Sequence, residues 1–167
     1  MRDFEKDHPK QIEITFLMQD WDDAYNVGGM FRVADALGCK EIFASGKTPL
    51  PPNPMIGVTS LGHHRRIEVH HRKIHEEAAQ LIKDRGYTLV TLEIADEAVP
   101  YTEFEWPAKV CLALGNEANG IYPSIMRQRD AAVYIPMFGK GRSMNVHVSG
   151  AVAAYHAVMS TLKNPTD

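Results

Sequence analysis

The chain has 167 residues, of which 44% are hydrophobic and 23% are charged. This balance is typical of a soluble globular protein, and we expect residues 1–167 to form a single domain. No apolar run approaches the roughly 20 residues of a membrane-spanning helix. The charged N-terminus, MRDFEKDHPK, lacks the apolar region of a signal peptide, so we expect a cytoplasmic protein without a membrane partner. The net charge of −3 gives no general support for nucleic-acid binding, which would have to depend on local basic patches.

The chain contains two cysteines, Cys39 and Cys111. Two are too few for a framework of several disulfides, and each lies beside or within an apolar segment. This pattern predicts two buried free thiols in a reducing compartment.

Short apolar runs alternate with helical patterns along the chain. In chain order we predict a strand over residues 12–18, a helix over 27–37, strands over 40–44 and 66–70, a helix over 74–85, strands over 87–92, 109–114 and 132–136, and a helix over 145–162. Prolines exclude a regular element from residues 46–54. This alternation predicts an α/β fold, a mostly parallel sheet with helices on both faces. Ligands bind beyond the carboxyl ends of strands in such sheets, which makes candidates of the loops at residues 19–26, 115–120 and 137–143.

The first candidate loop leads into a helix, in the segment DAYNVGGMFRVADALG. Asn26 is the expected N-cap of that helix. Glycines such as Gly28 weaken a first turn, so we expect a neighbouring segment to approach this backbone closely. Considered alone, the segment favours a capped surface helix on which Arg32 is simply solvated.

The second loop, LALGNEANGIYP, places Gly115 and Gly120 on either side of Glu117, directly after a buried strand. It lacks the Lys-Ser or Lys-Thr of a P-loop and the G-x-G-x-x-G fingerprint of dinucleotide sites. Alone, it could be an ordinary strand-to-helix turn with an exposed Glu117.

The third loop, in YIPMFGKGRSMNVHVSG, carries Lys140 and Arg142 between glycines. Ser143 or Asn145 can cap the last helix. That helix is rich in small residues, which would allow close packing within the chain or against a second subunit. A capped core helix after a solvated basic turn is the simpler alternative.

Together, the three segments resemble the three motifs of the SpoU/TrmH branch of the SPOUT RNA methyltransferases. The N-x-G-x-x-x-R motif matches at Asn26, Gly28 and Arg32, and the G-x-E-x-x-G motif at Gly115, Glu117 and Gly120. The I-P-M-x-G…S-x-N-V motif matches at Ile135, Pro136, Met137, Gly139, Ser143, Asn145 and Val146. The motifs occur in family order, and the resemblance covers about residues 12–160. Two departures are Met144, where leucine is usual, and His147, where a small residue is common.

The resemblance implies a SPOUT fold with a C-terminal trefoil knot, a homodimer, and methyl transfer from S-adenosylmethionine to a ribose 2′-hydroxyl in tRNA or rRNA. By position, it implies cofactor contacts from Leu92, Gly115, Ile135, Met137 and Met144. It also implies a catalytic set of Arg32, Asn26, Glu117, Ser143 and Asn145. An arginine has a pKa above about 12 and is an unfavourable base. We therefore expect Arg32 to bind the neighbouring phosphate and stabilise the developing alkoxide, and whether it also takes the proton stays open.

Basic residues gather in HHRRIEVHHRK, residues 63–73, and we expect Arg65, Arg66 and Arg142 to contact RNA. The histidines of this stretch suggest a zinc site as an alternative. No H-E-x-x-H or Cys/His ligand spacing is present, so we expect no metal. Two further alternatives are a SPOUT methyltransferase that modifies a base and an RNA-binding or assembly factor without catalysis.

Overall fold

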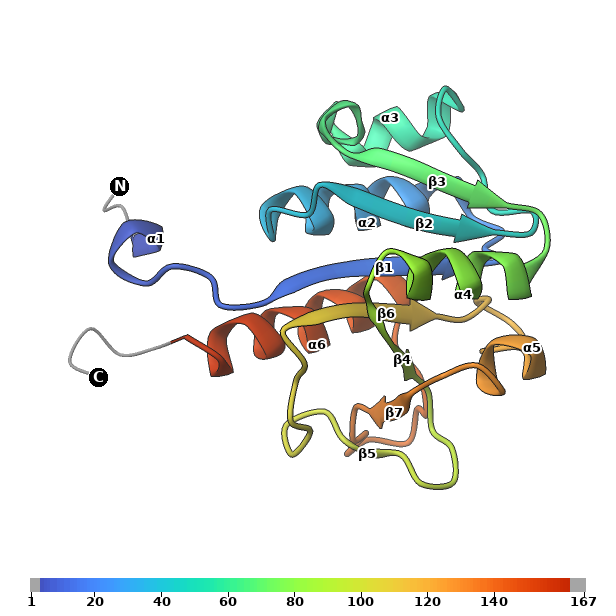
Figure 1. Ribbon diagram of the computed structural model, residues 1–167. Helices are drawn as coiled ribbons and strands as arrows, with labels where there is room; N and C mark the ends of the chain where they lie inside the picture. The colour runs from blue at the N-terminus through green and yellow to red at the C-terminus, as the bar shows by residue number, and fades with distance from the viewer. Residues whose placement is uncertain (1–3, 163–167) are drawn as a thin grey trace.

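A computed structural model describes residues 4–162, in which every strand pairing is parallel (Figure 1). The strands are β1 Glu13–Gln19, β2 Glu41–Ser45, β3 Glu68–Arg72, β4 Thr88–Leu92, β5 Val99–Pro100, β6 Lys109–Leu114 and β7 Ala131–Tyr134. Their order in the sheet is β3-β2-β1-β6-β4-β7-β5. The predicted fold class, a parallel α/β sheet with helices on both faces, is therefore confirmed.

The central strands are apolar because both faces of the sheet are covered. Alternate residues of β1 enter different cores: Ile14 and Phe16 pack on one face, and Leu17 packs on the other. The same alternation divides Leu112 from Cys111 in β6.

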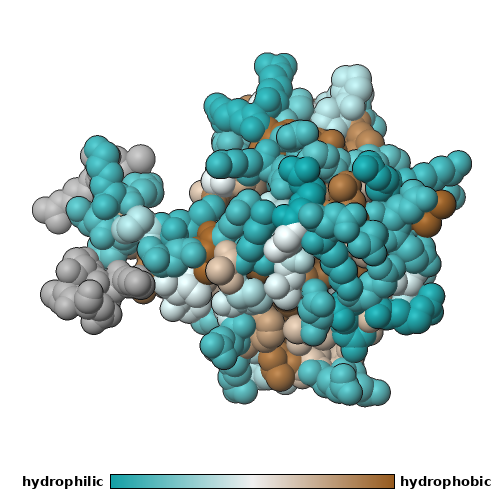
Figure 2. Space-filling model, viewed as in Figure 1, coloured by the Kyte–Doolittle hydropathy of each residue, from teal (hydrophilic) through white to brown (hydrophobic). Residues whose placement is uncertain are grey.

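Helices cover the two faces unequally. They are α1 Phe4–Asp7, α2 Ala24–Ala36, α3 Pro54–Ser60, α4 His75–Asp84, α5 Pro123–Met126 and α6 Val146–Ser160, with a 3₁₀ helix η1 at His63–Arg66. Helices α4 and α5 lie on one face, and α2 and α6 lie on the other, where α2 also packs against α3 (Figure 1). The face that carries α4 is mostly hydrophilic, with small separate hydrophobic patches (Figure 2). No helix within residues 4–162 has the length and apolar character needed to cross a membrane.

Both cysteines are buried and free, as predicted. Burial raises the pKa of the Cys39 thiol to about 12, and burial also raises the pKa of Cys111 well above its ordinary value. Both side chains therefore stay protonated and act as small apolar groups of the core.

The structure corrects three local predictions. Helix α2 begins at Ala24, because Asp23 is the N-cap and its carboxylate accepts a hydrogen bond from Tyr25 N at 2.8 Å; Asn26 is not the cap. Strand β3 begins at residue 68, since the preceding basic residues form η1. The predicted loop over residues 46–54 ends in α3, which begins at its last proline, a residue that a first helical turn accepts.

Candidate functional site

A cavity of about 320 Å³ lies beyond the carboxyl ends of β4, β6 and β7. Its size falls in the range of about 300–1,000 Å³ that is usual for small-molecule sites. Its wall consists of the segments that follow these strands: Leu92, Glu93, Ile94, Leu114, Gly115, Asn116, Glu117, Ala118, Gly120, Tyr134, Ile135, Met137, Arg142, Ser143, Met144, Val146 and Ser149. The cavity is thus where ligands bind in open parallel sheets.

The structure brings part of the predicted site together in this cavity. The five residues expected to contact the cofactor all line it: Leu92, Gly115, Ile135, Met137 and Met144. Glu117, Ser143 and Arg142 line it as well. The lining does not include the other predicted site residues, which are Asn26, Arg32, Asn145, Arg65 and Arg66.

The loop after β6 closes on itself, which explains its two glycines. Asn116 N donates to the Gly120 carbonyl at 3.0 Å, and Gly120 N donates back at 2.9 Å. A Cβ on Gly115 would lie 2.2 Å from the Gly120 carbonyl carbon, and Gly120 itself has a φ of +68°. Side chains at either position would therefore force this wall of the cavity apart.

Asn116 is a structural residue of the site that our sequence analysis missed. Its Nδ2 donates to the Asp20 carbonyl at 2.5 Å, and its Oδ1 accepts from Ala118 N at 2.9 Å and Asn119 N at 3.0 Å. The side chain therefore joins the loop after β6 to the loop after β1. The signal in the sequence was an asparagine two residues after an apolar strand, because a buried amide needs several partners.

Glu117 links the first and second motifs. Its carboxylate accepts hydrogen bonds from Asp22 N at 2.9 Å, Asp23 N at 3.2 Å and Asn26 Nδ2 at 3.3 Å. A carboxylate at the N-terminus of α2 is also favoured by the helix dipole. Asn26 is only 7% exposed, and its Oδ1 accepts from Asn145 Nδ2 at 2.8 Å, which adds the third motif. Three of the predicted catalytic residues thus form one chain of hydrogen bonds.

His147 joins the same chain, although it was not among the predicted site residues. Its Nδ1 lies 3.2 Å from Asn26 Oδ1, and its ring lies over Gly29 of α2, where a Cβ would be 2.8 Å from Nε2. Burial lowers the pKa of His147, and the charge of Asp23 opposes this only in part. The imidazole is therefore neutral at neutral pH.

The three predicted site arginines that do not line the cavity lie on or near α2. Arg32 is exposed on this helix and forms no hydrogen bond or ion pair within residues 4–162. Arg66 pairs with Asp35 of α2 at 2.9 Å, and Arg65 is exposed beside it on η1. The predicted RNA-binding arginines of η1 are thus held next to the helix that carries Arg32.

Comparison with known proteins identifies the family. The profile of the SpoU rRNA Methylase family matches residues 13–155. The chain belongs to this family. Within it, the chain is 28% identical over 155 residues to the tRNA (guanosine(18)-2'-O)-methyltransferase of Thermus thermophilus, covering 92% of this chain and 78% of that enzyme. It is 29% identical over 149 residues to the Escherichia coli enzyme of the same name, covering 89% of this chain and 64% of that enzyme.

The fold of this SpoU-family chain matches solved structures. The crystal structure of an AdoMet-bound rRNA methyltransferase from Sinorhizobium meliloti superposes with a TM-score of 0.84 at 24% identity. The match covers 93% of this chain and 59% of the other. The chain therefore spans less than two thirds of that relative, and the similarity establishes the fold.

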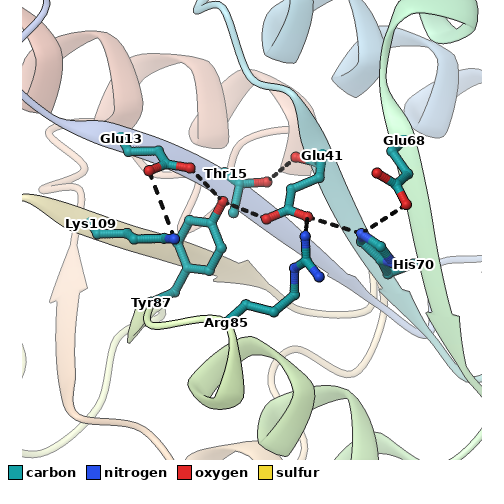
Figure 3. Close-up of polar contacts among 8 residues, drawn as sticks. All are labelled: Glu13, Thr15, Glu41, Glu68, His70, Arg85, Tyr87 and Lys109. Carbon is teal, nitrogen blue, oxygen red and sulfur yellow. Dashed lines mark hydrogen bonds and ion pairs between the residues drawn. The ribbon is translucent and has the colours of Figure 1, made fainter.

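A second polar cluster of the SpoU-family chain lies at the opposite, amino end of the sheet (Figure 3). Glu41, only 7% exposed, contacts Arg85 NH2 at 2.5 Å, Tyr87 OH at 2.8 Å and His70 Nε2 at 2.9 Å. Among the described residues, Glu41, Glu68 and His70 have ligand atoms close enough to hold a metal ion. The Arg85 guanidinium contacts the same Glu41 oxygen as His70 does, so a cation there would meet a fixed positive charge. The cluster is built as an ion-pair network.

Proposed function

We propose that this chain is an S-adenosylmethionine-dependent RNA methyltransferase that modifies a ribose 2′-hydroxyl in tRNA or rRNA. The observation that carries the proposal is the convergence of the motifs: the second and third line one cavity, and the first is hydrogen-bonded to its wall through Asn26 and Glu117. Family membership and the names of the relatives support the same reaction.

The cavity suits the cofactor chemically. Apolar side chains such as Leu92, Ile135 and Met137 offer surfaces for an adenine ring, and the strand ends offer main-chain groups. Glu93, Glu117 and Arg142 add charges of both signs, which suits a ligand that carries both an ammonium and a carboxylate. We propose that Leu92, Gly115, Ile135, Met137 and Met144 hold S-adenosylmethionine, which supplies an electrophilic methyl group bonded to a sulfonium.

The chain's own residues would position the ribose and stabilise charge. We propose that Arg32 binds the phosphate beside the target ribose and stabilises the 2′-oxygen as its proton leaves. Asn26, Glu117 and Asn145 hold the start of α2 against the cavity wall, and Ser143, on the wall itself, is available to the ribose. Arg65, Arg66 and Arg142 are proposed contacts for further RNA phosphates.

We also propose that the enzyme is a homodimer with α6 at the interface. Val148, Val152, Tyr155 and Met159 follow one another at helical spacing and are 37% to 52% exposed. An apolar stripe of this kind on a two-turn or longer helix is typical of a protein interface. A second copy would also supply an Arg32 from outside, which suits its absence from the cavity of its own chain. Light scattering should give twice the chain mass, and Tyr155→Glu should give monomers.

The trefoil knot and the cytoplasmic location belong to the same proposal. Strand order places β6 between β1 and β4, and the chain after β7 returns to α6, which packs on β6 and β1. We propose that this return passes through the family's knot, which an experimental trace of residues 88–160 would test. The two free buried cysteines suit a reducing compartment such as the cytoplasm.

Methyl transfer can be tested with radiolabelled S-adenosylmethionine and bulk tRNA and rRNA from cells that lack this protein. Ribose methylation protects the adjacent phosphodiester, so we expect label in nuclease-resistant dinucleotides. Label in ordinary mononucleotides would instead indicate a base methyltransferase. RNA binding without label in either fraction would overturn the proposal in favour of a non-catalytic RNA-binding factor.

A further inference from the structure

The hydrogen bonds around Asn26 fix the direction in which its amide points. Glu117 carries a carboxylate, which only accepts hydrogen bonds, so the Asn26 group that faces it at 3.3 Å is the NH₂. Asn145 gives a second, independent constraint. Its Oδ1 accepts from the backbone N of His147 at 3.0 Å, so its NH₂ is the group that reaches Asn26 at 2.8 Å. Asn26 Oδ1 is therefore an acceptor.

This direction determines the tautomer of His147. Its Nδ1 lies 3.2 Å from Asn26 Oδ1, and two acceptors cannot form a hydrogen bond, so Nδ1 must carry the proton. In the neutral ring, Nε2 then holds a free lone pair. Within residues 4–162, no donor reaches this nitrogen.

The free Nε2 lies on the surface of α2, one turn from Arg32. The ring covers Gly29 so closely that a Cβ there would be 2.8 Å from both Nε2 and Cδ2. Arg32 follows Gly29 at i+3, and side chains on a helix lean toward its N-terminus. An arginine at this position can therefore extend back toward the turn that holds Gly29, where the His147 ring lies.

We propose that His147 is a positioning residue for Arg32: its Nε2 accepts a hydrogen bond from the Arg32 guanidinium when that side chain lies along α2. Glu117, Asn26 and His147 would then form a relay that aims the arginine at the RNA. The inference rests on the proposed function for its purpose, but the contact itself can be tested on the protein alone.

The relay requires a neutral imidazole. A protonated His147 would present an N–H, and a positive charge, to the guanidinium. The charged groups that face the ring or its hydrogen-bonded partner are the carboxylates of Asp23 and Glu117, with Arg32 on the next turn of α2. Methyl transfer should therefore decline as the pH falls and His147 becomes protonated.

The contact is tested by NMR of the histidine side chains, without RNA or cofactor. We expect His147 in the Nδ1–H tautomer at neutral pH. We also expect Arg32→Ala to raise the pKa of His147, because a cation that donates to Nε2 disfavours protonation. The Nε2–H tautomer, or a His147 pKa that Arg32→Ala leaves unchanged, would overturn the proposal whether or not the protein methylates RNA.

Its consequence is tested by methyl transfer to bulk tRNA and rRNA. We expect His147→Ala to lower kcat by about tenfold, the loss of one hydrogen bond to a charged group, with an unchanged KM for S-adenosylmethionine. His147→Gln, which folds around the same neighbours without titrating, should lose the acidic limb of the pH profile. His156→Gln is the matched control on α6, since His156 packs against Tyr101 instead of α2. An acidic limb that persists in His147→Gln would contradict the role of His147.

Discussion

Each end of the parallel sheet holds a glutamate in a network of hydrogen bonds, but Glu41 at the amino end is buried and Glu117 at the carboxyl end is exposed. The two ends also differ in whether a nearby charged group is left without a partner. At the amino end, Glu41 is met by Arg85, Tyr87 and His70, and opposite charges pair within the cluster (Figure 3). At the carboxyl end, Glu117 accepts hydrogen bonds from two backbone N–H groups just before α2 and from the side chain of Asn26, while Arg32 of the same helix has no partner within residues 4–162. The first arrangement holds elements together, whereas the second holds a helix in place and leaves a cation available to a ligand.

The largest expected effect of a single change is at the carboxyl end. Arg32→Ala should lower methyl transfer by about a hundredfold or more, since a group that stabilises transition-state charge is worth roughly that factor. Because Arg32 is exposed and does not line the cavity, S-adenosylmethionine affinity and thermal stability should stay close to those of the parent. Calorimetric binding and turnover on bulk RNA measure the two quantities. Equal turnover in the variant and the parent would remove Arg32 from the mechanism.

At the amino end, a comparable change should affect stability instead. Glu41→Ala leaves Arg85, Tyr87 and His70 without their shared acceptor and should lower the free energy of unfolding by about 2 kcal/mol. Urea denaturation measures this loss. Glu68→Ala is the matched control, because Glu68 is 70% exposed and lies 3.6 Å from His70. If Glu41→Ala lowered kcat but left the free energy of unfolding unchanged, the contrast between the two ends would fail.

The stability that each end contributes to the protein should also be lost in a different range of pH. Burial opposes ionisation of Glu41, but hydrogen bonds from Arg85, Tyr87 and His70 outweigh it and hold its pKa below the ordinary value of 4.5. Its stabilising contribution is therefore present above pH 4.5 and is lost as the pH falls through the lowered pKa. Burial holds the pKa of His147 below its ordinary 6.5, so its contribution is lost as the pH falls from 6.5 toward the lowered pKa. Urea denaturation at a series of pH values should show both losses, with Glu41→Gln removing only the more acidic one.

The smallest effect is expected at the solvent-facing margin of the amino end. Lys109 Nζ lies 3.8 Å from Glu13 and 4.5 Å from the centre of the Tyr87 ring, and both charged side chains are well exposed. Lys109→Ala should therefore change the free energy of unfolding by no more than about 1 kcal/mol. A loss as large as that of Glu41→Ala would show that the network extends further toward solvent than its burial indicates.

Much of the fold followed from local sequence patterns. The nearly all-apolar run of residues 109–114 predicted β6 with its bounds, because a strand covered on both faces carries apolar side chains toward both sides of the sheet. The helix after the third motif began within one residue of its predicted start, and of the two predicted caps, Ser143 and Asn145, the structure uses Asn145. Asn26 was interpreted as a cap because asparagine is common there, but Asp23 supplied the hydrogen bond three residues earlier.

The site was predictable only in part, for a physical reason. The motif spacing named Asn26, Glu117 and Asn145, yet no local pattern could show that they bond to one another across 91 and 119 residues. Asn116 and His147 were not assigned to the site for the same reason, since the partners of each side chain are far away along the chain.

The sequence by itself determined the α/β class and the bounds of the main strands to within about two residues, because periodicity and capping act over a few neighbouring residues. It also located the three segments that carry the family motifs. The tertiary structure alone decided which polar groups pair and which stay free. Hydrogen-bond direction and burial depend on atoms that folding brings together, so the neutral His147 over Gly29 and the unpartnered Arg32 became visible only when α2 and α6 packed on the same face of the sheet.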